Sequence, residues 1–501
     1  MSSQAPPDGF ARVPTGIPGL DQVLQGGLLD GGLYVVAGTP GSGKTILANQ
    51  FCFARAAAGS RSLFVTMLGE SHGRMLRHLS TLDFFEPSHV PERVYYLSGA
   101  QAIESNALGN LMALLRKEIA ARDAGVLVLE GLFSSAAERP EQELRRFIYQ
   151  LQAEVQAAGC TALLTTDQLR PDYHPEYTLV DGIILLEQVA RGSRSMRRLQ
   201  VQKFRGSGFF AGKHDYEITE AGIAVYPRIE SVYARPSDRD RSLGTRTPIG
   251  VAGIDRMIGG GVPSGTTTLV LGPSGVGKTV LGLHYMCAAT PEQPALLFSF
   301  YETPERLLMK ARSVGLGLDK LIQQGTVEVV WQPPGGDSMD HVAQRLLRVV
   351  EQRGVRRLFI DGMQGFEAAT ADPERLVRFF NTLFNELRVR DVTSLYTGET
   401  QILIGSEVRS PVNGLSMLSE NILLLRFVER RARIHRIFSV LKVRDSAIDS
   451  ALREFHISSS GIDLASTSAT ADALYDKLQP PSRPGPPGFP AADPQPDRGD
   501  R

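Results

Sequence analysis

Hydrophobic residues along the chain follow two alternating patterns. Short runs of branched apolar residues, such as LYVVAG at 33–38 and RLFIDG at 357–362, predict buried β-strands. Between these runs, apolar residues recur three and four positions apart, which predicts amphipathic helices over 144–155 and 376–387. Near-continuous apolar strands that alternate with helices are typical of a parallel sheet with helices on both faces. The pattern therefore predicts an α/β fold.

The whole arrangement occurs twice. The segment TGIPGLDQVLQGGLLDGGLYVVAGTPGSGKT ends at Thr45, and its counterpart IGVAGIDRMIGGGVPSGTTTLVLGPSGVGKT ends at Thr279, 234 positions later. Such self-similarity indicates repeated structural units. We predict two tandem copies of one domain, over 11–233 and 245–465.

The remaining segments differ in composition from these two copies. Residues 234–244 are polar and charged, which is typical of an exposed linker. From 480 to 501, eight of 22 residues are proline and one is large and apolar, so this part cannot form a core by itself. We expect a flexible N-terminus over 1–10 and a disordered tail over 466–501.

Composition excludes several classes of protein. The 54 Lys and Arg residues balance 54 Asp and Glu residues, so no bulk charge favours nucleic acid or an anionic membrane. The three cysteines lack CxxC spacing, which argues against a disulfide framework or a cysteine zinc site. No apolar run approaches the roughly 18 residues of a membrane span, and no secretory signal is apparent. We expect a cytoplasmic protein.

Two segments match the P-loop pattern GxxxxGK[ST], and each follows a predicted strand and begins a predicted helix. In this motif, glycine lets backbone N–H groups surround a phosphate, lysine reaches the terminal phosphates and the hydroxyl ligates Mg²⁺. We therefore predict two sites for ATP and Mg²⁺. Their residues are Gly38, Thr39, Pro40, Gly41, Ser42, Gly43, Lys44 and Thr45 in the first copy, and Gly272, Pro273, Ser274, Gly275, Val276, Gly277, Lys278 and Thr279 in the second.

Each predicted metal site also needs a carboxylate from a neighbouring strand. Glu130 ends the run GVLVLE, and Asp361 ends the run RLFID. A carboxylate at the end of such a strand holds the hydration shell of Mg²⁺ in P-loop NTPases. We expect Glu130 and Asp361 to join Thr45 and Thr279 at the metal, although ordinary surface carboxylates would show the same pattern.

Several features together resemble the KaiC family within the RecA-like ATPases. They are the tandem P-loops, the preceding T-G-[IV]-x-G-[LI]-D element, whose second copy opens with Ile249, the run LFSFYETPERL and the late K-x-R segments. The resemblance covers the chain up to about residue 465. It implies two tandem RecA-like domains, a homo-hexameric ring with ATP between adjacent subunits, and a signalling role toward partner proteins.

The resemblance also assigns roles to the K-x-R segments. Lys203 and Arg205, and likewise Lys442 and Arg444, would reach the γ-phosphate of a neighbouring subunit. A cation there offsets charge that develops on the transferred phosphoryl group. Alternating charges on an exposed strand are the alternative explanation.

Members of the family usually carry two adjacent carboxylates after the second strand. Here Gly69 and Tyr301 each replace one of them, which leaves Glu70 and Glu302. A single carboxylate within hydrogen-bond reach can still orient or activate water, so we predict both as catalytic residues for ATP hydrolysis.

The kinase activity of the family phosphorylates adjacent Ser and Thr residues before the strand that reads NILLLRFVE here. Ser416 falls on the Ser position, but Met417 takes the Thr position and has no hydroxyl to phosphorylate. Ser416 is therefore the candidate phosphosite, with Ser419 nearby, and ordinary turn residues are the alternative. Serine/threonine autokinase activity is left open.

Polar residues at two further strand ends are candidate sensors of the γ-phosphate. Ligands of open parallel sheets collect at the carboxyl ends of strands, although capping or turn roles are equally compatible with these positions. The residues are Thr165, Thr166, Asp167, Thr397 and Glu399.

Two other functions compete with a signalling ATPase. A RecA-like DNA-dependent ATPase would use the local arginine clusters. Solvated hairpin arginines explain these clusters more simply, because they alternate with apolar strand residues, so nucleic acid is not an expected partner. A non-catalytic scaffold would bind ATP only to hold subunits together, and the replacements at 69 and 301 favour it. The arginine clusters are Arg191, Arg194, Arg197 and Arg198, and Arg426, Arg430, Arg431, Arg433 and Arg436.

Overall fold

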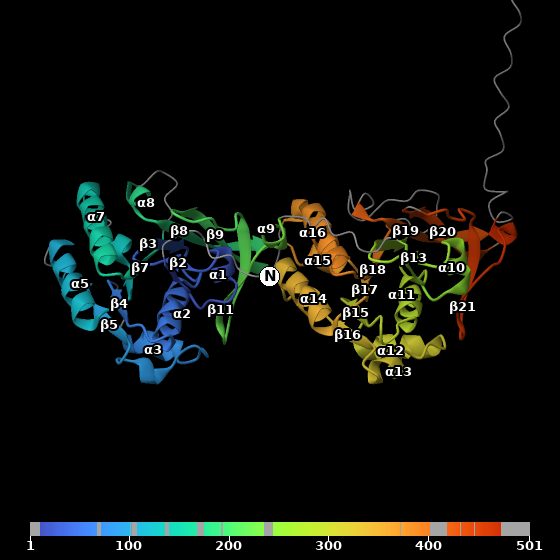
Figure 1. Ribbon diagram of the computed structural model, residues 1–501, viewed down its shortest axis with the longest axis horizontal. Coiled ribbons are helices and arrows are strands. Elements are labelled where there is room, and N and C mark those ends of the chain that lie inside the picture. Colours follow the sequence, from blue (N-terminus) through green and yellow to red (C-terminus); the bar gives the residue numbers. More distant parts are fainter. Residues whose placement is uncertain are drawn as a thin grey trace, which may run out of the picture. The chain divides into compact units, whose positions relative to one another are not determined.

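The computed structural model describes residues 11–67, 72–100, 102, 108–135, 140–167, 175–191, 194–234, 244–370, 372–400, 418–430, 432–444 and 446–471. They form two compact units (Figure 1). The first contains the described residues up to 234 together with Gly335–Arg348 and Phe366–Glu386, and the second contains the rest. No helix within the described ranges is both long and apolar enough to cross a membrane.

The first unit contains a nine-stranded, mostly parallel sheet with the strand order β11-β10-β9-β8-β3-β7-β6-β4-β5. The strands from β8 to β5 in this order run parallel, and β9, β10 and β11 extend the sheet in antiparallel fashion. The strands are β3 (Leu33–Gly38), β4 (Ser62–Thr66), β5 (Val94–Ser98), β6 (Val126–Glu130), β7 (Thr161–Thr166), β8 (Gly182–Arg191), β9 (Arg194–Phe204), β10 (Lys213–Thr219) and β11 (Gly222–Tyr226).

A second nine-stranded sheet repeats this topology in the order β16-β15-β17-β18-β14-β19-β20-β21-β22. Its strands are β14 (Thr267–Gly272), β15 (Ala295–Ser299), β16 (Val327–Trp331), β17 (Arg357–Asp361), β18 (Thr393–Glu399), β19 (Asn421–Arg430), β20 (Arg433–Val443), β21 (Arg453–Ser458) and β22 (Gly461–Leu464). Short pairs β1 (Arg12–Val13) with β2 (Leu28–Leu29), and β12 (Arg246–Thr247) with β13 (Val262–Pro263), precede the sheets in sequence. The predicted strands are confirmed.

The helices connect these strands. In the first copy they are α1 (Leu20–Val23), α2 (Lys44–Ala57), α3 (His72–Leu79), α5 (Leu108–Arg122), α6 (Leu132–Ser135), α7 (Glu141–Ala157), α8 (Pro175–Leu179) and α9 (Ile229–Val232). In the second copy they are α10 (Ala252–Met257), α11 (Lys278–Cys287), α12 (Pro304–Ser313), α13 (Leu318–Gln323), α14 (Met339–Arg353), α15 (Gln364–Ala368) and α16 (Leu376–Val389). The helices predicted over 144–155 and 376–387 are confirmed as parts of α7 and α16.

Alternation along β3 explains why helices cover both faces of the first sheet. Tyr34 and Val36 point into a core that they share with α2. Leu33 and Val35 point into the opposite core, which they share with α5 and α7. These two helices lie side by side in Figure 1. Because successive side chains of a strand point to opposite faces, one apolar run serves both cores.

The T-G-[IV]-x-G-[LI]-D element folds the same way in both copies. The Asp21 carboxylate accepts hydrogen bonds from the Thr15 backbone N–H at 2.7 Å and from the Gly16 N–H at 3.1 Å. Asp255 accepts the matching bonds from Ile249 and Gly250, also at 2.7 and 3.1 Å. Bonds to a charged acceptor are the stronger kind, so this aspartate fixes the loop before each P-loop strand.

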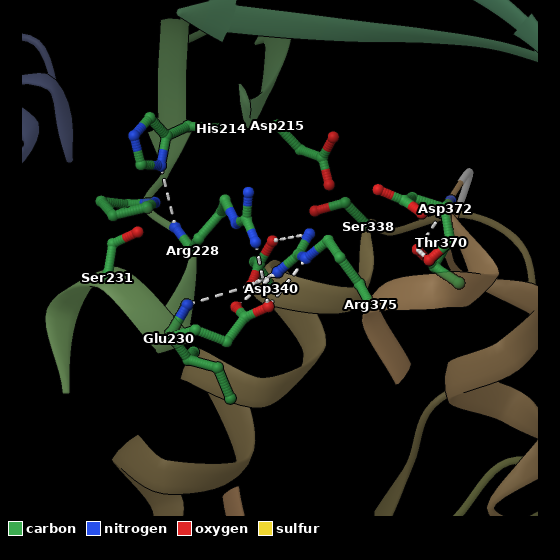
Figure 2. A network of polar contacts seen from close by, with 12 residues as sticks. His214, Asp215, Arg228, Glu230, Ser231, Ser338, Asp340, Thr370, Asp372 and Arg375 are labelled. Carbon is green, nitrogen blue, oxygen red and sulfur yellow. Dashed lines mark hydrogen bonds and ion pairs between the residues drawn. The ribbon is translucent and has the colours of Figure 1, made fainter. Parts of the chain in front are cut away.

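A buried ionic network ties three segments of the first unit together (Figure 2). The Arg375 guanidinium donates to Glu230 on α9 at 2.6 and 2.8 Å and to both oxygens of Asp340 on α14 at 3.0 Å. Burial opposes the charged form of Arg375, but these two carboxylates raise its pKa overall. Asp340 also accepts a bond from the Ile229 N–H at 3.1 Å. Paired in this way, the buried charges fix the first turn of α14.

Candidate active site

Both predicted phosphate-binding segments form the turn between a parallel strand and a helix, β3 to α2 and β14 to α11. Gly43 and Gly277 precede these helices with φ angles of 94° and 119°. A Cβ atom would lie 2.7 Å from Ile218 Cδ1 at the first position and 2.6 Å from Ile457 Cδ1 at the second. Glycine suits both positions because the positive φ angles would strain any other residue, and an added Cβ would also force the isoleucine side chain to shift.

The P-loop lysines lie over their own loops. Lys44 Nζ donates to the Gly38 carbonyl at 2.8 Å, and Lys278 Nζ donates to the Gly272 and Pro273 carbonyls, both at 2.8 Å. Burial lowers the pKa of Lys278, and the charges of Glu399 and Asp361 act in the opposite direction. Each ammonium group therefore lies over the start of the loop whose backbone N–H groups would surround a phosphate.

The structure brings each P-loop threonine to the predicted strand-end carboxylate. Thr45 Oγ1 donates to Glu130 Oε1, and Thr279 Oγ1 donates to Asp361 Oδ2 at 3.0 Å. Both carboxylates are at most 9% exposed. A hydroxyl and a carboxylate at the mouth of a phosphate loop form the hard oxygen set that suits Mg²⁺. The residues present therefore fit the metal that the sequence predicts.

Asp361 is held from both sides. Thr397 Oγ1 donates to Asp361 Oδ1 at 3.0 Å, and the same hydroxyl accepts a bond from the Gly362 N–H at 2.7 Å. Burial raises the pKa of Asp361, the bonds from Thr279 and Thr397 lower it, and the nearby charge of Glu302 raises it. Thr397, a candidate γ-phosphate sensor, thus orients the carboxylate of the second site.

Glu302 lies three residues beyond β15, where its backbone N–H donates to Ser299 Oγ at 3.2 Å. Its carboxylate forms an ion pair with Lys310 on α12. The neighbouring Tyr301 is 53% exposed. Glu70, Gly69, Ser416 and Met417 lie outside the described residues.

The K-x-R residues contact backbone carbonyls near the ends of their hairpins. Lys203 Nζ donates to the Tyr177 carbonyl at 2.8 Å, and Arg205 Nη2 donates to the Thr178 carbonyl at 2.6 Å, both on α8. Lys442 Nζ donates to the carbonyl of Ser419 at 2.9 Å, so these two lysines have matching positions. The backbone N–H of Arg444 donates to Asn421 Oδ1 at 3.3 Å. A role toward a neighbouring subunit stays a prediction for all four residues.

Sequence reasoning missed two ion pairs at the sites. Lys44 Nζ lies 2.6 Å from Asp167 Oδ1, just beyond β7, and Glu302 is paired with Lys310. The first pair had a usable signal, because Asp167 follows a strand that could neighbour the P-loop strand in a parallel sheet. The second depends on how α12 packs, which the local pattern does not encode.

A family model described as ATPase: KaiC matches residues 13–230 and again residues 247–469. The chain belongs to the KaiC family. Two relatives are similar over most of their length. The circadian clock oscillator protein KaiC of Synechococcus elongatus is 25% identical over 471 residues, covering 91% of this chain and 89% of the relative. The circadian clock protein KaiC3 of Synechocystis sp. is 25% identical over 481 residues, covering 91% and 92%.

KaiC membership agrees with the topology. Each matched stretch contains one complete P-loop, one Thr–carboxylate pair and one nine-stranded sheet with the same strand order. The resemblance seen in the sequence and the fold class, two tandem RecA-like P-loop ATPase domains, are therefore confirmed.

Proposed function

We propose that this KaiC-family chain binds ATP with Mg²⁺ at both P-loops and hydrolyses it. The observation that carries this proposal is the pairing of the P-loop threonine with a buried strand-end carboxylate, once in each copy. Two sites assembled from the same parts favour nucleotide chemistry over a chance match to the motif.

Different side chains contact the phosphates, the metal and the attacking water. Lys44 and Lys278 hold the terminal phosphates, and Thr45, Thr279, Glu130 and Asp361 hold the metal through its ligands and hydration shell. Bound Mg²⁺ supplies charge that offsets the phosphate oxygens. Glu70 and Glu302 orient the attacking water.

Glu302 needs a change of partner before it can act. While its carboxylate is paired with Lys310, the ammonium group competes with water for the same oxygen. Lys203, Arg205, Lys442 and Arg444 offset charge on the γ-phosphate of an adjacent subunit.

We also propose the larger organisation implied by the family. The domains span 11–233 and 245–465, joined by the linker 234–244 and flanked by flexible segments 1–10 and 466–501. Six copies form a ring with ATP between subunits, and nucleotide state presents surfaces to signalling partner proteins in the cytoplasm. Any autokinase activity acts on Ser416. The two relatives are named as clock proteins, and a regulatory role of this kind is part of the proposal.

A non-catalytic scaffold is the second candidate, because both ion pairs place a charged partner on a group that catalysis needs. A DNA-dependent ATPase has less support. Arg198, a member of the first arginine cluster, is 13% exposed in its side chain and lies 3.4 Å from Asp215 Oδ1. It is therefore not the solvated hairpin residue that the sequence indicated, and it is turned toward a carboxylate instead of an open surface.

One experiment separates these functions. Full-length protein is incubated with Mg²⁺ and γ-labelled ATP, and free phosphate and protein-bound label are followed together. Steady phosphate release that disappears when Lys44 and Lys278 are replaced by alanine supports the ATPase, and protein-bound label lost with Lys278→Ala adds the kinase. ATP binding without turnover supports the scaffold, and strong stimulation by single-stranded DNA supports the DNA-dependent enzyme.

A further inference from the structure

A second group of titratable side chains lies in the first unit, apart from both P-loops. It combines Glu217 on β10 with Asp337, which lies just before α14, and His341 in the first turn of α14. One carboxylate oxygen from each acid and one imidazole nitrogen all lie within 4.8 Å of one another. Asp337 precedes the helix by two residues, and its Oδ1 lies 3.7 Å from Nδ1 of His341 in the first turn.

The His341–Glu217 contact is a hydrogen bond at the long end of the normal range, and the distances in this group also suit a shared cation. His341 Nδ1 lies 3.4 Å from Glu217 Oε1 and 3.7 Å from Asp337 Oδ1. N–H···O bonds have a preferred length of about 2.9 Å. Ligands about 2.1 Å from a tetrahedral metal are separated by roughly 3.4 Å, close to the distances seen here. By contrast, His435 Nδ1 lies 2.7 Å from Glu454 Oε1 in the second unit, as a directly bonded pair does.

Neighbouring residues fix the orientation of these side chains. The Tyr226 ring stacks on the His341 imidazole, with centroids 4.0 Å apart and planes 8° from parallel. The Tyr226 hydroxyl donates to Glu217 Oε2 at 3.3 Å, which leaves Oε1 facing the histidine. Ser338 Oγ accepts the His341 backbone N–H at 3.3 Å. Metal ligands in proteins are oriented by such outer hydrogen bonds.

The helix that carries the histidine is itself held in place. Asp340, next to His341, is fully buried in the Arg375 network (Figure 2). The first turn of α14 therefore presents His341 from a fixed backbone. Sites on rigid elements hold their ligands in place more accurately than sites on loops.

The group is open to solvent and negatively charged. A cleft of about 270 Å³ is lined by Glu217, Asp337 and Ser338, among others. The three ligand side chains are 27–30% exposed. Burial raises the pKa of Tyr226, and the charges of Glu217 and Asp337 raise it further. The charge of Arg348 acts in the opposite direction. The cleft gives an ion access and leaves room for water as a further ligand.

We propose that Glu217, Asp337 and His341 bind a first-row divalent transition metal ion, with Zn²⁺ as the best match. One imidazole and two carboxylates form a mixed N/O set that suits zinc better than the all-oxygen sets of Mg²⁺ and Ca²⁺. Two carboxylates and a neutral imidazole also balance the charge of the ion. The site links β10 of the first copy to the start of α14 in the second.

Zinc binding to the untagged full-length protein tests this site directly. After removal of metals with a chelator, equilibrium dialysis against Zn²⁺ is expected to show one site that His341→Gln weakens by more than about 100-fold, because even outer-shell changes cost 10–100-fold. His435→Gln, which changes the directly bonded pair, is expected to leave this site unchanged. Co²⁺ in place of Zn²⁺ is expected to give a visible absorption band typical of tetrahedral coordination.

A second variant keeps the test decisive if His341→Gln disturbs the stack with Tyr226. Glu217→Gln removes one charged ligand, and circular dichroism together with nucleotide binding shows that the variant is folded. Loss of the cobalt band in either folded variant supports the site. Zinc affinity equal to that of the wild type in the folded variants, or no zinc binding by the wild type above the level of His341→Gln, overturns it.

Discussion

Both P-loop lysines donate to two carbonyls of their own loops, but Lys44 Nζ also forms an ion pair with Asp167 at 2.6 Å, whereas the charge of Glu399 raises the pKa of Lys278 against the effect of burial. The loops have the same motif and the same strand-to-helix position. The carboxylates at the ends of the neighbouring strands differ in identity and contact: Asp167 follows β7, and Glu399 is the last residue of β18. Two copies of one motif can therefore respond differently to ATP, because a phosphate entering the first site competes with Asp167 for the lysine.

The carboxylates on the metal side also differ between the two sites. Glu130 is one methylene longer than Asp361, and its Oε1 accepts from Thr45. Asp361 accepts one hydroxyl on each oxygen, from Thr279 and Thr397. A shorter side chain has less rotamer freedom to lose on binding a metal ion. We expect the second site to be the better organised one.

The largest expected effect is on turnover. Glu302→Gln should lower the rate of ATP hydrolysis at the second site by about 10²–10⁴-fold while ATP still binds, because it removes the group that orients water. Phosphate release in a Lys44→Ala background isolates this site. Glu305→Gln, at an exposed position on α12, is the matched control. An unchanged rate would remove Glu302 from the mechanism.

Glu70→Gln in a Lys278→Ala background is the counterpart for the first site. Comparison of the two rates tells which copy turns over ATP faster, and a larger loss in the first copy would reverse the ranking that the carboxylates favour.

The next largest effect is expected from replacement of the P-loop lysines. Lys278→Ala should lower hydrolysis at its own site by about 10²–10³-fold, since it removes a preorganised cation from the transferred phosphate. Lys44→Ala should do the same at the first site. Lys320→Ala and Lys117→Ala, both exposed, serve as controls in a labelled-phosphate assay. A large loss from only one lysine would show that the other copy contributes little turnover.

A smaller effect is expected at the metal-side carboxylates. Asp361→Asn should raise the Mg²⁺ concentration that half-maximal ATP binding requires by about 10–100-fold, the range typical of groups that act around a metal. Glu130→Gln should cost less, because the longer side chain is the less constrained one. Titration of ATP binding against Mg²⁺ measures both, with exposed Asp463→Asn as the control. Equal losses would contradict the proposed difference between the sites.

The smallest effect concerns Asp167. Its side chain is 47% exposed, and pairs of this kind are worth about 0.2–1 kcal/mol. Asp167→Asn should therefore tighten ATP binding at the first site by up to about fivefold, measured by nucleotide titration in a Lys278→Ala background. Weaker binding would instead show that Asp167 acts as a sensor of the γ-phosphate. Glu399→Gln in a Lys44→Ala background provides the matched change in the other copy.

The sequence by itself determined the repeat, apolar core strands such as those at 33–38 and 357–361, and both phosphate loops, because each depends on local periodicity or on a short contiguous motif. It also named Glu130 and Asp361, since parallel strands end at the same edge of a sheet. Identification of the antiparallel strands β9 to β11 as an extension of the same sheet required the structure.

Only the tertiary structure decided which charges meet. The pairs Lys44–Asp167 and Glu302–Lys310, the buried Arg375 network, and the approach of His341 to Glu217 each depend on strand order or on helix packing. A charged residue has the same local pattern whether it is solvated or paired, because pairing depends on how the folded chain places the two groups in space. The positions of the phosphate loops could thus be predicted from the sequence, whereas their electrostatic environment, and the His341 cluster, arise from the folded chain.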